Sequence, residues 1–375
     1  MKNSFISFIN KKDHYVVITA WVIFQLIWIA VFGFDFQGES NKYIREANLF
    51  VTNNGFTQHR YIFYSTTILL IVFSNLIKIG LHGAVFMVMF INLVCYLKFY
   101  KSLNTLFKDK LPAVLVVIFL MVFWPYQRWT VTLYSEGIFY SLVMLLCAVL
   151  ISYKKLSLKY LLGLSTVLSL LILTRPMGVL FIIPVAMFIY FHLVGRQKIF
   201  FLLTLIAGGI LINEVSQIVF TTTADWDMKK ALQSDIIIAD KDDYPVNNAI
   251  ILSDSRNQLY QLIFYITHNF SHFIMLATKR LQAFFFLVRN YYSTLHNLFL
   301  LAPVACMYLL IIFYFNKIRT VLGRPLLVFM LSSIFFFALA VSLQFDDYHN
   351  RFFLLLMPIL TVMALAGIFH KHLSK

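Results

Sequence analysis

The stretch 61-YIFYSTTILLIVFSNLIKI-79 decides how this chain is folded, because it is long enough to cross a bilayer but is not purely apolar. Its polar and charged side chains are Ser65, Thr66, Thr67, Ser74, Asn75 and Lys78. If this stretch crosses the membrane, every later loop changes side. The distribution of lysine and arginine along the rest of the chain distinguishes the two cases.

The composition is that of a membrane protein. Hydrophobic residues make up 61% of the 375 residues, charged residues only 13%, and the mean hydropathy is +0.80. A soluble domain of this length cannot hide so much apolar surface, and repeated apolar runs indicate membrane spans. We therefore predict an all-α polytopic membrane protein with about ten transmembrane helices. The predicted spans are 15–33, 81–99, 112–126, 137–153, 159–174, 176–194, 199–220, 296–316, 325–343 and 352–369.

The basic residues favour the topology in which 61–79 does not cross. The cytoplasmic pieces then hold more than half of the 31 basic residues, but only two acids, Asp13 and Asp109. The whole formal charge of +15 lies on that face, as the positive-inside rule expects. We predict a partly immersed or re-entrant helix at 61–79. The cytoplasmic pieces are 1–14, 98–111, 154–159, 195–198, 317–324 and 370–375.

This topology defines the organisation of a single transmembrane domain, 1–375. Both termini are predicted to be cytoplasmic, and the first span is expected to be an uncleaved signal anchor. The outer segment 34–80 is expected to hold an amphipathic and a re-entrant helix. The outer segment 221–295 is expected to be a polar lobe followed by a helix at 259–294 lying in the membrane interface. Topology and attraction to anionic membrane lipid account for the charge, so no nucleic-acid partner is expected.

The three cysteines, Cys95, Cys147 and Cys306, each lie inside an apolar run. They are expected to be small buried residues rather than halves of a disulfide. No cluster of cysteine and histidine has the spacing of a zinc site.

The stretch 38-GESNKYIREANLFVTNNGF-56 places Glu39 directly after the first span, with Asp35 nearby. Apolar residues recur from Tyr43 onward at helical spacing, so 40–54 is predicted to be a short amphipathic helix. Ser40 is expected to be its N-cap and Gly55 its C-terminal stop. Glu39 is then either a helix-capping acid or a general base held at the membrane surface.

Three further outer sites carry charges close to membrane depth, where charges are costly and often functional. Glu136 begins a span in 134-YSEGIF-139, and Arg175 lies at a turn in 173-LTRPMG-178. The stretch 344-QFDDYHNRFFLLLMP-358 holds His349 and Arg351. Each site also has a plain interpretation: an interfacial acid, a snorkelling arginine and a solvated loop. Taken together, carboxylates and guanidinium groups on one face suit a reaction in which a hydroxyl attacks and a phosphate leaves.

The order of these features resembles the polytopic GT-C glycosyltransferases, the class of the protein O-mannosyltransferases, the aminoarabinose transferases and the lipid-linked mannosyltransferases. The most specific piece is 38–56, which is similar to a Gly-Asp-Ser-x-x-Tyr pattern of bacterial members. The resemblance implies a GT-C-like fold in the bacterial inner membrane. It also implies inverting transfer of a sugar from a polyprenyl-phosphate carrier to a hydroxyl of a lipid or cell-surface glycan.

The resemblance assigns roles to the candidate residues. Glu39 stands where the family has its catalytic Asp, and Asp35 stays an alternative base. Tyr43 and His59 are predicted to contact the substrate, and Glu136 to orient the acceptor or a divalent cation, Mg²⁺ or Mn²⁺. The remaining residues, Arg175, His349 and Arg351, are predicted to hold the carrier phosphate.

Two other functions stay open. A polysaccharide polymerase with many spans also uses outer arginines, but it takes a glycan on pyrophosphate rather than a sugar on monophosphate. A transporter or flippase for a lipid-linked glycan favours polar residues at mid-membrane and internal repeats. The predicted spans are apolar in their middles apart from Glu214, and no repeat is visible.

Overall fold

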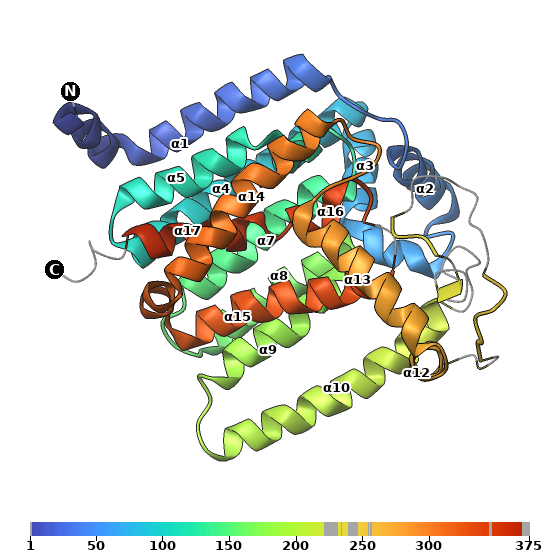
Figure 1. Ribbon diagram of the computed structural model, residues 1–375. Helices are drawn as coiled ribbons and strands as arrows, with labels where there is room; N and C mark the ends of the chain where they lie inside the picture. Colours follow the sequence, from blue (N-terminus) through green and yellow to red (C-terminus); the bar gives the residue numbers. More distant parts are fainter. Residues whose placement is uncertain are drawn as a thin grey trace. The chain divides into compact units, whose positions relative to one another are not determined.

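Most of the chain is helical in the computed structural model, which describes residues 2–220, 232–233, 235–238, 247–253, 255, 257–344 and 347–369 (Figure 1). In these residues the only β-type pairing is an isolated bridge between Asp35 and Thr132. The all-α prediction is confirmed. The α-helices are α1 (Lys2–Phe32), α2 (Ser40–Asn53), α3 (Ser65–Leu76), α4 (Gly80–Phe107), α5 (Lys110–Val122), α6 (Trp124–Gln127), α7 (Ser135–Ile151), α8 (Leu158–Thr174), α9 (Ile182–Tyr190), α10 (Arg196–Phe220), α12 (Gln258–His268), α13 (Phe270–Phe286), α14 (Thr294–Phe313), α15 (Phe315–Leu343), α16 (Arg351–Leu354) and α17 (Met357–Ile368). Short 3₁₀ helices are η1 (His59–Tyr64), η2 (Arg128–Thr130), η3 (Pro176–Phe181) and η5 (Tyr348–Asn350).

The chain divides into two compact units, each of which is described by itself. Unit 1 comprises Met1–Val185, Met307–Met330 and Leu354–Lys375. Unit 2 comprises Ala186–Cys306 and Leu331–Phe353. The organisation as one transmembrane domain, 1–375, stays a prediction.

Several helices are long and apolar enough to span a membrane, as expected of an integral membrane protein. Within the described residues, four helices meet this criterion alone: His14–Phe32, Gly80–Phe107, Thr294–Phe313 and Phe315–Leu343. Two bent pairs raise the number to six. One pair joins Lys110–Val122 to Trp124–Thr130 at 72°, where Pro125 interrupts the helix, and the other joins Tyr348–Leu354 to Met357–Ile368 at 49°. Three further predicted spans form shorter apolar helices, Ser135–Ile151, Leu158–Thr174 and Pro176–Tyr190.

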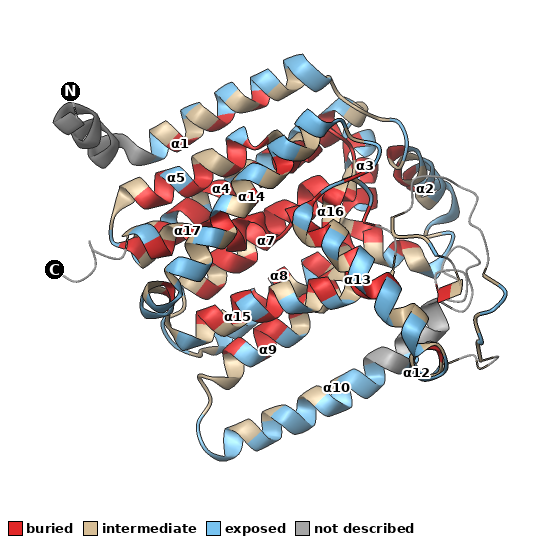
Figure 2. Cartoon of the chain, in the orientation of Figure 1, coloured by how far each residue is buried: buried red, intermediate tan, exposed pale blue. Residues whose placement is uncertain are grey.

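Large apolar side chains are exposed on the surfaces of α10 and α4, as a lipid environment allows. Figure 2 shows α10 as mostly exposed, and its Phe200 and Leu211 are 68% and 64% exposed. On α4, Phe90 is 66% exposed. Water penalises such surfaces and hydrocarbon does not, so these helices are suited to a bilayer.

The core of unit 1 is built from α1, α4, α5 and α7, which lie side by side (Figure 1). Helix α7 is buried around almost its whole circumference. A polar group lies within this core: Asn92 accepts hydrogen bonds from Trp21 Nε1 at 2.9 Å and Gln127 Nε2 at 3.0 Å. Its amide nitrogen donates to Ser141 Oγ at 2.9 Å. The expectation of apolar span centres was therefore wrong for α4, because packing pairs buried polar groups with one another.

Helix α3, which comes from the ambiguous stretch 61–79, begins and ends at the same end of the unit 1 helices. At its start, Thr66 Oγ1 donates to Thr174 Oγ1 at 2.7 Å, at the last residue of α8. At its end, Ser74 donates to the carbonyl of Gly80, where α4 begins. The first turn of α4 carries His82, whose ring contacts Phe34 at 5.3 Å, just beyond the last residue of α1. The stretch thus runs across the ends of its neighbours instead of along them.

In unit 2, the interfacial segment predicted at 259–294 is not one helix. It forms α12 and α13, which are separated at Asn269. The Asn269 side chain accepts from the backbone nitrogen of Ile251 at 3.0 Å and donates to the Ile251 carbonyl at 2.7 Å. An asparagine that bonds to a distant backbone competes with helix continuation, which explains the break. Most of the polar lobe predicted before it, 221–231 and 239–246, lies outside the described residues.

The cysteines are free, as expected. Cys95 and Cys147 are buried, whereas Cys306 on α14 is exposed, so its predicted burial was wrong. An apolar residue in a membrane helix is shielded equally by protein or by lipid, so the sequence does not distinguish these environments.

Candidate active site

Glu39 lies at the N-terminus of α2 and is itself the N-cap, so the prediction that Ser40 caps this helix was wrong. At the other end of α2, Asn54 takes the left-handed conformation with φ 52°, instead of Gly55. Gly38 has φ +59°, and a Cβ there would collide with the hydroxyl of Tyr134. Glycine thus lets Tyr134 come close enough to accept a hydrogen bond from the Glu39 backbone nitrogen, at 3.0 Å.

A short parallel pairing aligns the two segments that build the site. The Asp35 backbone nitrogen donates to the Val131 carbonyl at 3.3 Å, and the Leu133 nitrogen donates to the Asp35 carbonyl at 3.0 Å. This pairing brings the start of α7, at Ser135, beside the start of α2. The Asp35 carboxylate itself accepts from the Gln37 backbone nitrogen at 2.9 Å, which is a local turn contact.

A chain of hydroxyl groups connects Glu39 to the interior. Tyr43 lies one helical turn after Glu39, so both face the same side of α2. The Tyr43 hydroxyl donates to Glu39 Oε1 at 3.1 Å and lies 3.2 Å from Ser135 Oγ. Tyr43 has one proton to donate, and its bond to Glu39 leaves Ser135 to donate to Tyr43 or to Glu136 Oε2, which is 3.3 Å away.

The inner end of this chain is a buried ion pair. Arg175 Nη1 pairs with Glu136 Oε1 and also donates to Ser135 Oγ at 3.2 Å. The side chains of Arg175 and Glu136 are only 6% and 1% exposed. Each charge compensates the other, because an unpaired charge at such depth carries a large desolvation penalty.

The end of α8 fixes the position of Arg175. The residue before a proline is disfavoured in helical conformation, and Arg175, which precedes Pro176, is extended at φ −153° and ψ 142°. Its backbone nitrogen donates to the Leu171 carbonyl at 3.1 Å, and its carbonyl accepts from Gly178 at 2.9 Å. A Cβ on Gly178 would collide with the backbone of Leu171, so glycine permits this tight turn.

Charges alternate along the cluster that these contacts form. Lys42 Nζ lies 2.7 Å from Glu39 Oε1, so two cations balance two carboxylates. Lys42 also lies over the rings of Tyr43 and Tyr64, at 4.9 and 4.6 Å. Burial, followed by the nearby Glu39 carboxylate, raises the pKa of Tyr43 well above its usual value. Tyr43 is therefore a hydrogen-bond donor at any physiological pH.

The structure brings together four of the predicted site residues: Glu39, Tyr43, Glu136 and Arg175. His59 is exposed at the start of η1, and no contact between it and this cluster is seen among the described residues. Two others, His349 and Arg351, belong to unit 2. Their predicted role at the same phosphate stays a prediction.

The sequence reasoning missed two members of the cluster. Ser135 joins Tyr43 to the ion pair, and it lies in the quoted piece YSEGIF directly before Glu136, which was the available signal. Lys42 was also missed, although its position three residues after Glu39 is a helical ion-pair spacing. Glu46 is a further buried carboxylate: it accepts from the Thr57 backbone nitrogen at 2.7 Å and hydroxyl at 2.6 Å, and so closes the loop after α2.

The cluster offers a half-buried carboxylate in a fixed orientation. The Glu39 side chain is 21% exposed, so a hydroxyl from solvent can reach it, while Tyr43 and Lys42 hold it in place. Across the described part of the chain, no three His, Cys, Asp or Glu side chains converge to hold a metal ion. The predicted divalent cation stays a prediction.

Comparison of the chain with protein-family models, curated proteins and solved structures finds no match. The resemblance to GT-C glycosyltransferases thus rests on the residues of this chain alone.

Proposed function

We propose that this protein is a membrane glycosyltransferase with a GT-C-like fold. It moves a sugar from a polyprenyl-phosphate carrier to a hydroxyl of a lipid or cell-surface glycan, on the extracytoplasmic side of a bacterial inner membrane. The observation that supports this proposal is the partly exposed Glu39 carboxylate, held by Tyr43 and Lys42 at the ends of the unit 1 helices. A base in that place meets a substrate at the membrane surface.

The reaction is an inverting displacement. Glu39 takes the proton of the acceptor hydroxyl while the oxygen of that hydroxyl bonds to the anomeric carbon of the donor sugar. The bond from that carbon to the phosphate oxygen breaks, and the carrier phosphate leaves with the electron pair. His349 and Arg351 are the proposed phosphate-binding groups. Arg175 has a different part, because Glu136 already balances its charge: it orients Ser135, and through Tyr43 it orients Glu39.

The proposed topology has ten membrane passes and both termini in the cytoplasm. It is supported by the course of α3, which begins and ends at the same end of the unit 1 helices. It is also supported by the concentration of lysine and arginine in alternate loops. The passes are α1, α4, α5 with α6, α7, α8, η3 with α9, α10, α14, α15, and α16 with α17.

The test is transfer of radiolabelled sugar in membranes supplied with polyprenyl-phosphate donors. Positioned base catalysis contributes roughly 10²–10⁴-fold, so Glu39→Gln is expected to raise the barrier by about 3–5 kcal/mol. Asp35→Asn is the matched control, since the Asp35 carboxylate serves a local turn. Transfer that survives Glu39→Gln but is lost in Asp35→Asn would move the base to Asp35. A wild type that is inactive with every monophosphate donor would refute the proposal, and activity with pyrophosphate-linked glycans would favour a polymerase.

A transporter for a lipid-linked glycan is the second candidate, and the buried Asn92 is the observation in its favour. A polar group at that depth is a feature of transport pathways. However, Asn92 makes three hydrogen bonds inside the protein, to Trp21, Gln127 and Ser141, which suits a static packing contact. Uptake of a labelled lipid-linked glycan into vesicles by both the wild type and Glu39→Gln would support the transporter.

A further inference from the structure

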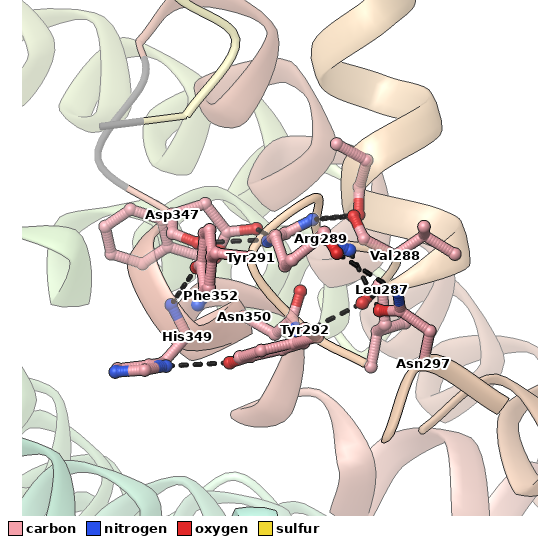
Figure 3. Close-up of polar contacts among 11 residues, drawn as sticks. Leu287, Val288, Arg289, Tyr291, Tyr292, Asn297, Asp347, His349, Asn350 and Phe352 are labelled. Carbon is pink, nitrogen blue, oxygen red and sulfur yellow. Dashed lines mark hydrogen bonds and ion pairs between the residues drawn. The ribbon is translucent and has the colours of Figure 1, made fainter. Parts of the chain in front are cut away.

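A second buried ion pair holds two loops of unit 2 together (Figure 3). Arg289 Nη2 and Asp347 Oδ2 lie 2.8 Å apart, and their side chains are 1% and 2% exposed. Arg289 also donates to the Ala283 carbonyl at 2.6 Å, at the end of α13. Asp347 Oδ1 accepts from the Phe352 backbone nitrogen at 3.0 Å, at the start of α16. The pair therefore fixes the segment after α13 against the segment before α16.

The backbone of both segments is held in an uncommon conformation. Leu287, His349 and Asn350 have φ values of 58°, 54° and 59°, in the left-handed region that non-glycine residues rarely adopt. The Asn350 side chain donates to the Leu287 carbonyl at 3.3 Å and so links two of them. Such conformations persist only where the surroundings impose them, and they cluster at binding sites.

Each of these two segments carries a tyrosine whose ring is exposed on the surface, Tyr291 and Tyr348. The rings of Tyr291 and Tyr348 have centroids 5.9 Å apart and planes inclined by 31°, and the residues are 40% and 42% exposed. We call this pair the tyrosine platform. The Tyr291 hydroxyl accepts from the His349 backbone nitrogen at 3.4 Å, so the ring is anchored at its polar end.

Further rings contact the platform: Tyr292 lies edge-on to Tyr291 with centroids 4.7 Å apart, and the His349 ring centroid lies 3.9 Å from that of Tyr348. The Tyr292 hydroxyl and His349 Nδ1 share a hydrogen bond of 2.7 Å, and their rings are nearly parallel at 11°. Figure 3 shows this bond beside the Arg289–Asp347 pair. One face of Tyr292 stacks on His296, with ring centroids 4.0 Å apart. Rings that are held in this way lose little conformational entropy on binding.

We propose that the tyrosine platform binds a carbohydrate ring by stacking. The face of an aromatic ring is electronegative and attracts the slightly positive C–H groups on one face of a sugar, while hydroxyl and imidazole groups at the edge bond to sugar hydroxyls. This inference rests on the proposed function, because a glycosyltransferase must recognise a sugar, and it assigns a sugar-binding surface to unit 2.

The anchoring of the platform, and not its position, distinguishes these tyrosines from an aromatic belt. Tyrosines of an aromatic belt lie at the ends of spanning helices and need only an apolar body and a polar tip. Tyr291 and Tyr348 also lie at or just before the start of candidate spans, but a buried ion pair holds both loops and the Tyr291 hydroxyl is bonded to the His349 backbone. A belt residue tolerates leucine, whereas a stacking platform requires a ring. This difference decides the design of the experiment.

The experiment is saturation-transfer NMR on the full-length protein in detergent, with a panel of methyl glycosides as probes. We expect saturation to pass from the protein to the C–H protons of at least one glycoside. Tyr348→Ala and Tyr348→Leu should each weaken its apparent affinity about 3- to 10-fold, while Tyr348→Phe stays within about twofold. Tyr260→Ala is the matched control, because Tyr260 is 52% exposed on α12 and lies outside the platform.

Two results would overturn the proposal: no glycoside signal in the wild type, or a signal that Tyr348→Leu leaves unchanged. The leucine variant keeps the apolar bulk, so it answers the question even if the alanine variant does not fold. Binding is measured without turnover, so the outcome is separate from that of the transfer assay. If Glu39→Gln stops sugar transfer but the Tyr348 variants leave the glycoside NMR signal unchanged, the platform is refuted and the proposed function stands. If Glu39→Gln leaves sugar transfer unchanged but the Tyr348 variants weaken the glycoside signal, the platform stands and the role of Glu39 is refuted.

Discussion

The buried pair of Glu136 and Arg175 gives the sharpest energetic prediction. Three variants define a double-mutant cycle: Glu136→Gln, Arg175→Met and the double variant. Each single change leaves the opposite charge buried without its ionic partner. The side chains of Glu136 and Arg175 are only 1% and 6% exposed, so water cannot solvate the charge that a single variant leaves unpaired.

The magnitude follows from this burial. Removing one member of a buried ion pair costs about 3–5 kcal/mol, whereas replacing both members with neutral side chains of similar size is often nearly neutral. The double variant is therefore expected to be no less stable than either single variant. The coupling free energy is then at least about 3 kcal/mol, which is large for a pair of residues in contact.

The assay is reversible unfolding in mixed micelles as the denaturing detergent is raised, followed by tryptophan fluorescence. The matched control is a second cycle on Asp235 and His272, which lie 2.7 Å apart but have a 55% exposed aspartate. That pair is expected to couple by less than about 1 kcal/mol. If the Glu136 and Arg175 variants are additive to within that same value, the two residues are not an energetically coupled pair and the reasoning fails.

Two further predictions concern the surroundings of Glu39. Because burial raises the pKa of Tyr43, the unfolded chain ionises this tyrosine first, and the free energy of unfolding of the wild type should fall as pH rises above about 10. Tyr43→Phe lacks this contribution, so denaturation curves at pH 8 and pH 11 should show a smaller loss, and an equal loss would contradict the shift. Gly38→Ala is expected to lower stability by more than Gly33→Ala, measured by thermal unfolding. Both glycines have left-handed φ values, +59° and +67°, which cost about 1–2 kcal/mol with alanine, but only at Gly38 does the added Cβ also meet the Tyr134 hydroxyl. Equal losses would show that this contact is unimportant.

The sequence by itself determined the features that depend on local order. Apolar runs and helical spacing gave an all-helical membrane protein, and the periodicity after Glu39 gave α2 to within one residue at each end. Pro176 indicated the end of α8, because the residue before a proline leaves the helical region. Four predicted residues lie in the cluster around Glu39. Three of them, Glu39, Glu136 and Arg175, could be recognised in the sequence as charges beside apolar runs.

Only the tertiary structure decided which of these groups meet. Ser135 and Arg175 are 40 residues apart in the chain, and no spacing rule connects them. Packing of α7 against α8 brings them together, and it turns Arg175 from an open cation into the partner of Glu136. The same holds for Asn92 in the core and for Arg289 with Asp347, whose partners lie on other segments. Short-range sequence patterns fix a helix and its faces, but the pairing of buried polar groups depends on which faces pack, and this is a property of the whole fold.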